Sequence, residues 1–381
     1  MSSIHKINFF FACIILAVDS LNGFFLFKGI NLPISQVFKL LFTATMIMGL
    51  IKLYYHKFVI WFVLLVLFVS IFNIGNNPIF FFESLILSQK FLFTVLTYFY
   101  FTEYFKKSSA LNYNFVYASN LSVIILNIIF SLVGIGYFAY SQGIGYTGFF
   151  FAPNELSFLV LIFFSHYLYE INLRKSKYFI PLFILLLIIS TMLAMKVAIM
   201  GVFLVGWFVF FSGKLTLKKM IFASVVLLFV IFLLSKYFYL LEAFINMLKY
   251  RYNSSDNMIN FFLSNRDKFL IEEICLYLNS SAIALLFGLS GTMTVEMDFF
   301  DVLFNYGLIG FIIIYLFYIY VVITSRKNKT KRDGRFSLFV NLLVILTSLF
   351  VGHFVFSAMG GFFFAYFNAV KRKDKKHLED K

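Results

Sequence analysis

Long apolar stretches recur from one end of the chain to the other, with short polar segments between them. Many of them approach the roughly 20 residues that an α-helix needs to cross a bilayer. We predict membrane spans at residues 7–27, 34–53, 58–74, 85–104, 115–137, 156–172, 178–195, 197–212, 220–238, 302–324, 336–353 and 356–370. The pattern therefore predicts an all-α polytopic membrane protein with about 12 transmembrane helices, forming a single domain over residues 1–381.

The amino-acid composition agrees with this pattern. Hydrophobic residues make up 62% of the 381 positions and charged residues only 13%, against about 25% charged residues in soluble domains. The apolar run after Lys6 is too long for the core of a signal peptide, and no small-residue cleavage site follows it, so we interpret it as the first span. Cys13 and Cys275 are the only cysteines, and Cys13 lies in an apolar run, which argues against a disulfide framework or a cysteine metal site.

The net charge of +15 is typical of nucleic-acid-binding proteins, but its distribution argues otherwise. If both termini are cytoplasmic, 23 of the 32 lysines and arginines lie in cytoplasmic segments, including six in 325–335 and six in 371–381. That placement obeys the positive-inside rule for short loops. We therefore predict cytoplasmic termini, a basic cytoplasmic tail at 371–381 and no nucleic-acid partner.

One larger loop, residues 239–301, is predicted on the outer face between the ninth and tenth spans. It holds eight of the 17 acidic residues. Within it, Ser264 and Asp267 fit the N-cap and N3 positions of a capping box. An apolar stripe at helical spacing follows, made of Phe269, Leu270, Ile274, Tyr277 and Leu278. We predict a short amphipathic helix over 265–278 that lies on the outer membrane surface.

Several motifs of known enzymes and pumps are absent from the sequence. There is no Walker A loop, no HExxH motif and no GxSxG nucleophile elbow, and the five histidines are far apart. The chain is therefore not an ATP-driven pump by itself, and we predict neither a metal nor a cofactor. Its function is expected to depend on outward-facing polar residues carried by membrane helices.

The first candidate site is the segment 148–155, before the sixth span. Pro153 can occupy the first turn of a helix, and Asn154 and Glu155 would then lie beside the free backbone N–H groups of that helix. An outward-facing helix N-terminus can bind an anion. The segment is equally compatible with a plain loop-to-helix cap.

Three basic residues could contact phosphate. Lys196 lies between two apolar runs, where it can either snorkel to the interface from a hairpin tip or bind phosphate. Arg266, at the start of the predicted loop helix, could form a bidentate fork with phosphate oxygens or pair with Asp267 or another nearby carboxylate. Arg251 is a further candidate of the same type.

The remaining candidates could transfer protons. Glu296, Asp298 and Asp301 lie at the outer mouth of the tenth span, where carboxylates could bind a divalent cation, act as a general base or cap a helix N-terminus. Asp298, Asp301 and Asn305 share one face of a helix. His353 titrates near neutral pH and suits proton transfer, although a membrane histidine can also be a hydrogen-bonded structural residue.

Four short segments, taken in order along the chain, resemble the O-antigen polymerase and O-antigen ligase superfamily of bacterial envelopes. Thr147-Gly-Phe-Phe-Phe-Ala-Pro-Asn-Glu-Leu156 is similar to the family's Gly-x-x-x-x-Pro-Asn segment after the fifth span. Met195-Lys-Val-Ala198 stands where members often have Ser-Arg-Gly-Ala. The stretch from Glu296 to Gly310 resembles a Gly-containing re-entrant helix, and Val351-Gly-His-Phe-Val-Phe-Ser357 resembles the Gly-His-Val segment of the polymerase branch. The similarity covers roughly residues 115–370.

The resemblance implies a glycosyltransferase of the bacterial plasma (inner) membrane that acts outside the cytoplasm. Its donor would be a glycan on a polyprenyl diphosphate, and its acceptor a sugar hydroxyl of a lipid-linked repeat unit of O-antigen, capsule or exopolysaccharide. Lys196 and Arg266 would stabilise the leaving diphosphate, and His353 or one of the acids at 296–301 would accept the proton. Flippase and chain-length regulator proteins are the implied protein partners, beside membrane lipid.

Alternatives remain open from the sequence. An O-antigen ligase of the same superfamily is one, but the loop 239–301 lacks the histidine that ligases place there, which favours a polymerase. A flippase or transporter of lipid-linked oligosaccharide is another, and the charges Asp19, Lys39 and Lys90 within apolar runs would suit it. A membrane acyltransferase would need a buried histidine with an acidic partner, and His166 has no obvious one.

Overall fold

The structure is a computed structural model, which describes residues 3–52, 81–107, 113–141, 144–173, 178–211, 266–289, 295–327, 329–350, 352, 354 and 357–370. The helices that coincide with predicted spans are α1 (Ser3–Phe27), α2 (Ile34–Lys52), α4 (Phe81–Lys107), α5 (Tyr113–Leu132), α6 (Pro153–Leu173), α7 (Phe179–Met192), α8 (Lys196–Phe211), α14 (Asp298–Lys327), α15 (Lys331–Phe350) and α16 (Ala358–Ala369). Five of the described helices, α1, α2, α5, α6 and α14, are long and apolar enough to cross a membrane. The predicted spans 58–74 and 220–238 lie outside the described residues.

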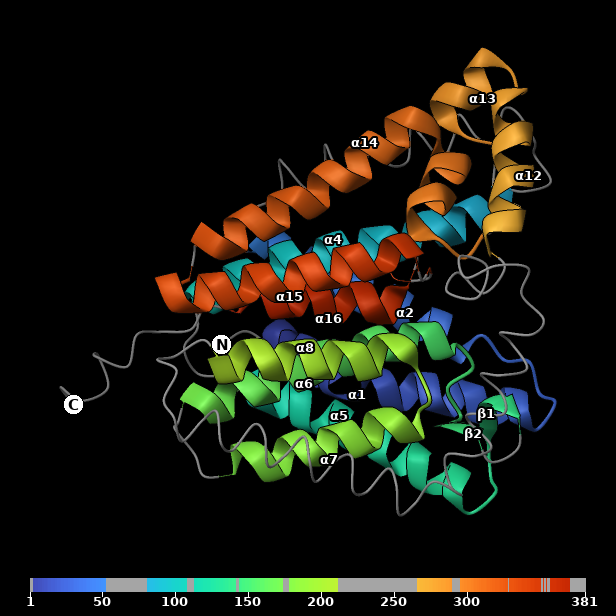
Figure 1. Cartoon of the computed structure of the whole chain (residues 1–381). Coiled ribbons are helices and arrows are strands. Elements are labelled where there is room, and N and C mark those ends of the chain that lie inside the picture. Colours follow the sequence, from blue (N-terminus) through green and yellow to red (C-terminus); the bar gives the residue numbers. More distant parts are fainter. Residues whose placement is uncertain are drawn as a thin grey trace.

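The long helices lie side by side in a bundle (Figure 1), as expected for an all-α membrane protein. The pair α4 and α16 packs most closely, and Gly361 of α16 lies against the Thr94 side chain of α4. Around this pair, α6 packs on α8 and α1 packs on α2 and α5. The interior is rich in aromatic side chains, and Phe93 stacks on Phe362 across the α4–α16 contact.

The two ends of the bundle differ. Figure 1 shows α12 (Arg266–Leu278), α13 (Ala282–Phe287) and the strands β1 and β2 at one end, and the N-terminus at the other. Tyr306 near the start of α14 contacts Ser88 near the start of α4, and Thr324 near the end of α14 contacts Tyr98 further along α4, so these two helices run in parallel. We call the end with β1, β2, α12 and α13 the hairpin end, and the opposite end the N-terminal end.

A β-hairpin replaces the end of the predicted fifth span. Helix α5 ends at Leu132, and β1 (Tyr137–Ser141) pairs antiparallel with β2 (Ile144–Gly148). Gly136, between α5 and β1, has φ +119°, and a Cβ there would lie 2.7 Å from the Gly148 carbonyl oxygen. The prediction of a helix to residue 137 was therefore wrong, because the backbone needs glycine to leave the helix and approach β2 closely.

The predicted loop helix is confirmed as α12, although Ser264, its predicted N-cap, lies outside the described residues. Leu270, Ile274 and Tyr277 pack in a small apolar cluster with α13 and the start of α14. Phe269 and Leu278, also assigned to the stripe, are 59% and 64% exposed, because at 100° per residue they fall on its two flanks. The position of α12 on a membrane surface stays a prediction.

Helix α14 bends sharply at Gly307, which has φ +62° and ψ −173°. The bend is a close backbone contact, since a Cβ on Gly307 would lie 2.5 Å from the Gly288 nitrogen at the end of α13. A short helical segment from Asp298 to Tyr306 therefore precedes a straight segment to Lys327, whose rise of roughly 30 Å matches the hydrocarbon thickness of a bilayer. The re-entrant-like stretch from Glu296 to Gly310 contains this bend.

Candidate functional site

The segment before α6 is held by α5. The Asn127 side-chain oxygen accepts from the Phe149 nitrogen at 2.8 Å, and the Ser131 hydroxyl oxygen accepts from the Gly148 nitrogen at 2.6 Å. On its other side, the Phe149 carbonyl lies directly against Gly23 of α1, where a Cβ would overlap it. These contacts determine where α6 begins.

Glu155, in the first turn of α6, lies within hydrogen-bonding reach of Ser357, the N-cap residue of α16. The ammonium groups of Lys90 on α4 and Lys39 on α2 also act on its carboxylate electrostatically. The carboxylate thus belongs to a set of charges that four elements share. Asn154 beside it accepts the Ser157 hydroxyl hydrogen bond on its backbone carbonyl, at 2.6 Å.

A second carboxylate lies close to this group. One oxygen of Asp19 on α1 accepts from the Lys39 ammonium at 2.7 Å and from the Ser35 hydroxyl, which also accepts from Lys39 at 2.8 Å. The side chains of Asp19 and Lys39 are only 6% and 15% exposed. The other oxygen of Asp19 is buried and has no hydrogen-bond partner among the described residues. It is an acceptor that can take a hydroxyl or ammonium hydrogen.

We call Asp19, Lys39, Lys90 and Glu155 the interhelical charge cluster. They come from α1, α2, α4 and α6, all in the half of the bundle toward the hairpin end, and their formal charges cancel. A buried ion pair is weak evidence for stability, because desolvation of the ions offsets their attraction. Because such charges add little stability, their presence inside a membrane bundle indicates a candidate functional site.

Asp301 and Asp298 bind backbone amides. The two oxygens of Asp301 accept from the nitrogens of Val295 at 2.6 Å and Met297 at 3.1 Å, and the residue is 2% exposed. Asp298 is fully buried and accepts from the Phe354 nitrogen at 2.8 Å. These contacts fit the helix-capping interpretation, because the carboxylates shape the turn before α14 and hold the chain that leads into α16.

Glu296 joins two of the singled-out segments. Its carbonyl accepts from the Gly352 nitrogen at 2.6 Å, and a Cβ on Gly352 would lie 2.8 Å from the Met297 nitrogen. Glu296 itself has φ +60°, a strained value for a residue with a side chain. The structure thus brings the segments 148–155, 296–301 and 352–357 together at the hairpin end. His353 lies outside the described residues.

Arg266 pairs with a carboxylate, as one of its two interpretations expects. Its guanidinium lies 2.6 Å from a Glu296 carboxylate oxygen, with side-chain exposures of 14% and 49%. The pair joins the start of α12 to the strained turn before α14. Further along α12, burial and the neighbouring Glu272 raise the pKa of Glu273 above its usual range.

Of the two other predicted phosphate-binding residues, the structure describes Lys196 but not Arg251. Lys196 is the first residue of α8, is partly buried and follows a turn in which Ala194 has φ +53°. Helix α8 packs on α6 and α7, and the α7–α8 turn lies beside the hairpin, where the Leu193 carbonyl faces Gly145. Its phosphate role stays a prediction. Arg251 lies outside the described residues.

Within the described ranges, no group of three or more His, Cys, Asp or Glu side chains is placed to hold a metal ion. Comparison with protein-family models, with curated proteins and with solved structures finds no match to this chain. The functional argument therefore rests on the residues themselves. From the sequence, Asp19, Lys39 and Lys90 were named together as charges within apolar runs, but Glu155 was placed in a different candidate site.

Proposed function

We propose that the chain is a polymerase of lipid-linked oligosaccharide repeat units, acting at the hairpin end of the bundle. The observation that supports it is the interhelical charge cluster beside the segments 148–155 and 352–357. In one place these elements supply two cations, two carboxylates and two serine hydroxyls, inside an apolar bundle that suits a lipid carrier. Transfer of a sugar from a lipid diphosphate needs such a combination.

The proposed reaction is a single displacement. The acceptor hydroxyl oxygen forms a bond to the anomeric carbon of the donor glycan, the bond from that carbon to the diphosphate oxygen breaks, and the hydroxyl proton passes to a base. Lys39 and Lys90 would stabilise the negative charge that develops on the diphosphate. Glu155 is the carboxylate best placed to accept the proton, with His353 as the alternative. No nucleotide sugar or metal takes part.

In the proposed topology, about 12 spans place both termini in the cytoplasm of a bacterium and the hairpin end outside the plasma membrane. The positive-inside distribution of lysine and arginine supports this orientation. Reporter fusions at residues 110, 215 and 330 should then report cytoplasm, and one at 255 the outer face. A cytoplasmic signal at 255 would contradict the site assignment.

The function is tested by deleting the gene, complementing it with variants and separating the surface glycan on a gel. Glu155→Gln removes the carboxylate charge at nearly constant volume, and single repeat units should accumulate. Glu103→Gln is the matched control, because Glu103 is also a carboxylate with a lysine partner, Lys106, but lies on α4 at the other end of the bundle. Polymer of normal length from Glu155→Gln at normal protein level would exclude Glu155 as an essential base.

A flippase of lipid-linked oligosaccharide is the second candidate. It is favoured by the position of Asp19 and Lys90, which lie two to three helical turns inside α1 and α4, within the depth of the bilayer. The same gel separates the functions. Loss of a flippase leaves no exported glycan, loss of a polymerase leaves single repeat units, and loss of a ligase leaves polymer on the lipid carrier.

A further inference from the structure

The connection between α14 and α15 at the N-terminal end is a tight, basic turn. A Cβ on Gly334 would lie 2.9 Å from the Arg326 carbonyl oxygen, and the Thr330 hydroxyl oxygen accepts from the Asp333 nitrogen at 3.3 Å. These contacts bring the last residues of α14 beside the first turn of α15. Basic side chains from both helices therefore gather around one turn. We call Arg326, Lys327, Arg332 and Arg335 the basic turn.

The charges of the basic turn face outward. All four side chains are exposed, and none forms an ion pair with a carboxylate in the part of the chain that the structure describes. Asp333, the acidic residue of this turn, is 8% exposed and accepts the Tyr169 hydroxyl hydrogen bond inside the bundle. Among the described side chains, the outer surface of the turn therefore carries positive charge, which suits an anionic partner.

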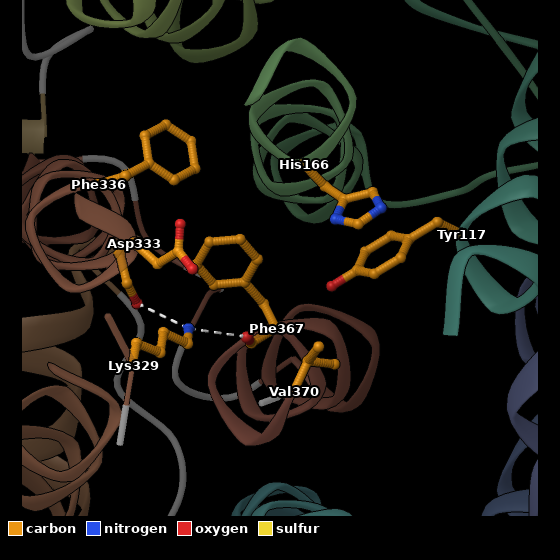
Figure 2. Close-up of a pocket in the computed structure, with 8 residues that line it drawn as sticks. Tyr117, His166, Lys329, Asp333, Phe336, Phe367 and Val370 are labelled. Atoms are coloured by element: carbon orange, nitrogen blue, oxygen red, sulfur yellow. Dashed lines mark hydrogen bonds between the residues drawn. The ribbon is translucent and has the colours of Figure 1, made fainter. Parts of the chain in front are cut away.

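A small polar cavity lies directly inside the turn. The Lys329 ammonium donates to the Ser337 hydroxyl at 3.0 Å and to the Phe367 carbonyl at 3.3 Å. Figure 2 shows Tyr117 and His166 on the opposite side of the cavity from Lys329. Its volume of about 10 Å³ accommodates roughly one water molecule, so a phosphate group cannot enter. Lys329 braces the turn against α16, and an anion would bind outside it.

The depth of the turn identifies the anion. The straight part of α14, from the bend at Gly307 to Lys327, rises roughly 30 Å, which is the thickness of the hydrocarbon core. The basic turn therefore lies at the level of the lipid headgroups. Arginine forms two parallel hydrogen bonds with phosphate oxygens, and the Arg332 guanidinium lies 6.0 Å from the centre of the Tyr169 ring, which restrains its orientation.

We propose that the basic turn binds the phosphate headgroup of an anionic phospholipid from the leaflet at the N-terminal end. Basic pockets between transmembrane helices at headgroup depth bind such lipids. The bound lipid would link α14 to α15 and keep the N-terminal end of the bundle at the level of the lipid headgroups. This inference does not depend on the proposed function, which concerns the opposite end of the bundle.

The test uses the full chain in phosphatidylcholine vesicles that contain trace spin-labelled phosphatidylglycerol or spin-labelled phosphatidylcholine. The ratio of the two association constants measures headgroup selectivity. The variant Arg326→Gln/Arg332→Gln/Arg335→Gln should lose most of the preference for phosphatidylglycerol. The control Lys6→Gln/Lys52→Gln/Lys106→Gln removes the same charge from exposed residues of the same end and should keep it.

Two results would overturn the proposal: equal loss in both triple variants, which indicates general surface charge, and unchanged selectivity in the arginine variant. If the triple arginine variant does not fold, Arg332→Lys replaces it, because this single change keeps the charge but removes the planar fork. Its selectivity should fall, and an unchanged value would contradict the proposal. Inorganic phosphate in the buffer should not displace the labelled lipid, and full displacement would identify free phosphate as the ligand.

Discussion

At the hairpin end, the Asp19 carboxylate is 6% exposed and pairs with Lys39 from another helix, whereas at the N-terminal end Arg326, Arg332 and Arg335 are exposed and have no described carboxylate partner. Both sets of charges belong to helices of one bundle. The exposed arginines need no protein partner, because water or the phosphate of a lipid headgroup can solvate them. Asp19 and Lys39 are buried and compensate each other from two different helices, so they indicate a site.

The largest expected effect tests this difference between the ends. Lys39→Met leaves the buried Asp19 carboxylate without its cation and should lower the free energy of unfolding by about 3 kcal/mol. Lys106→Met breaks the Lys106–Glu103 pair at the N-terminal end, whose lysine is 41% and glutamate 11% exposed. This variant should lower the free energy of unfolding by less than Lys39→Met does, because water already reaches the lysine end of this pair. Denaturant unfolding in detergent measures both. Similar losses for the two variants would remove the distinction between buried and exposed pairs.

The double variant Asp19→Asn/Lys39→Met sharpens the result. It removes both charges, so much of the stability lost in Lys39→Met should return. If the double variant is no more stable than the single one, the loss has another origin, such as packing of the lysine stem.

The next effect concerns the bend of α14 at the hairpin end. Gly307→Ala adds a Cβ that would lie 2.5 Å from the Gly288 nitrogen at a residue with φ +62°, so backbone strain and overlap both act. We expect a loss of about 3 kcal/mol. Gly29→Ala is the control, because Gly29 has φ +77° but nothing within 4 Å of the added Cβ, which leaves only the backbone strain of about 1 kcal/mol. Equal losses would show that the contact with α13 is unimportant.

A smaller effect on stability separates two roles of Arg266. Arg266→Lys and Glu296→Gln both weaken the ion pair, and each should cost less than about 1 kcal/mol because Glu296 is 49% exposed. If Arg266 also holds the diphosphate, Arg266→Lys loses the planar fork, and polymer formation should fall sharply while Glu296→Gln polymerises normally. Equal activity of the two variants would assign Arg266 to the ion pair alone.

The smallest effect is a pH dependence in α12. Burial and the negative charge of Glu272 raise the pKa of Glu273, so the folded protein binds this proton more tightly than the unfolded chain does. Its contribution to stability is therefore present at low pH and is lost as pH rises through the raised pKa. Glu273→Gln should raise the melting temperature slightly at pH 7 and leave it unchanged near pH 4. A variant that melts below the natural protein at pH 7 would contradict the shift.

Elements that depend on local spacing could be predicted from the sequence. The apolar runs located the helices of the bundle but not the short helix α13, because membrane burial requires long uninterrupted apolar stretches whatever packs beside them. The same holds for α12, whose stripe of Leu270, Ile274 and Tyr277 repeats at the helical period. The hairpin after Leu132 was missed, because the apolar sequence of a membrane span and that of a β-hairpin are similar. The close contact between Gly136 and Gly148 of β2, which distinguishes the hairpin, exists only in the folded protein.

The candidate site depended on tertiary structure, because its contacts join residues far apart in the chain. The position of Asp298 at the start of a span suggested a general base. In the structure its carboxylate accepts a hydrogen bond from the backbone nitrogen of Phe354, 56 residues away. Glu155 suggested a helix cap, but Lys39 and Lys90 on two other helices act on it. The sequence by itself determined which charges lie in apolar surroundings. Only packing decided which of them meet, because the charges that compensate Asp19 and Glu155 lie on other helices, at positions that sequence spacing does not relate.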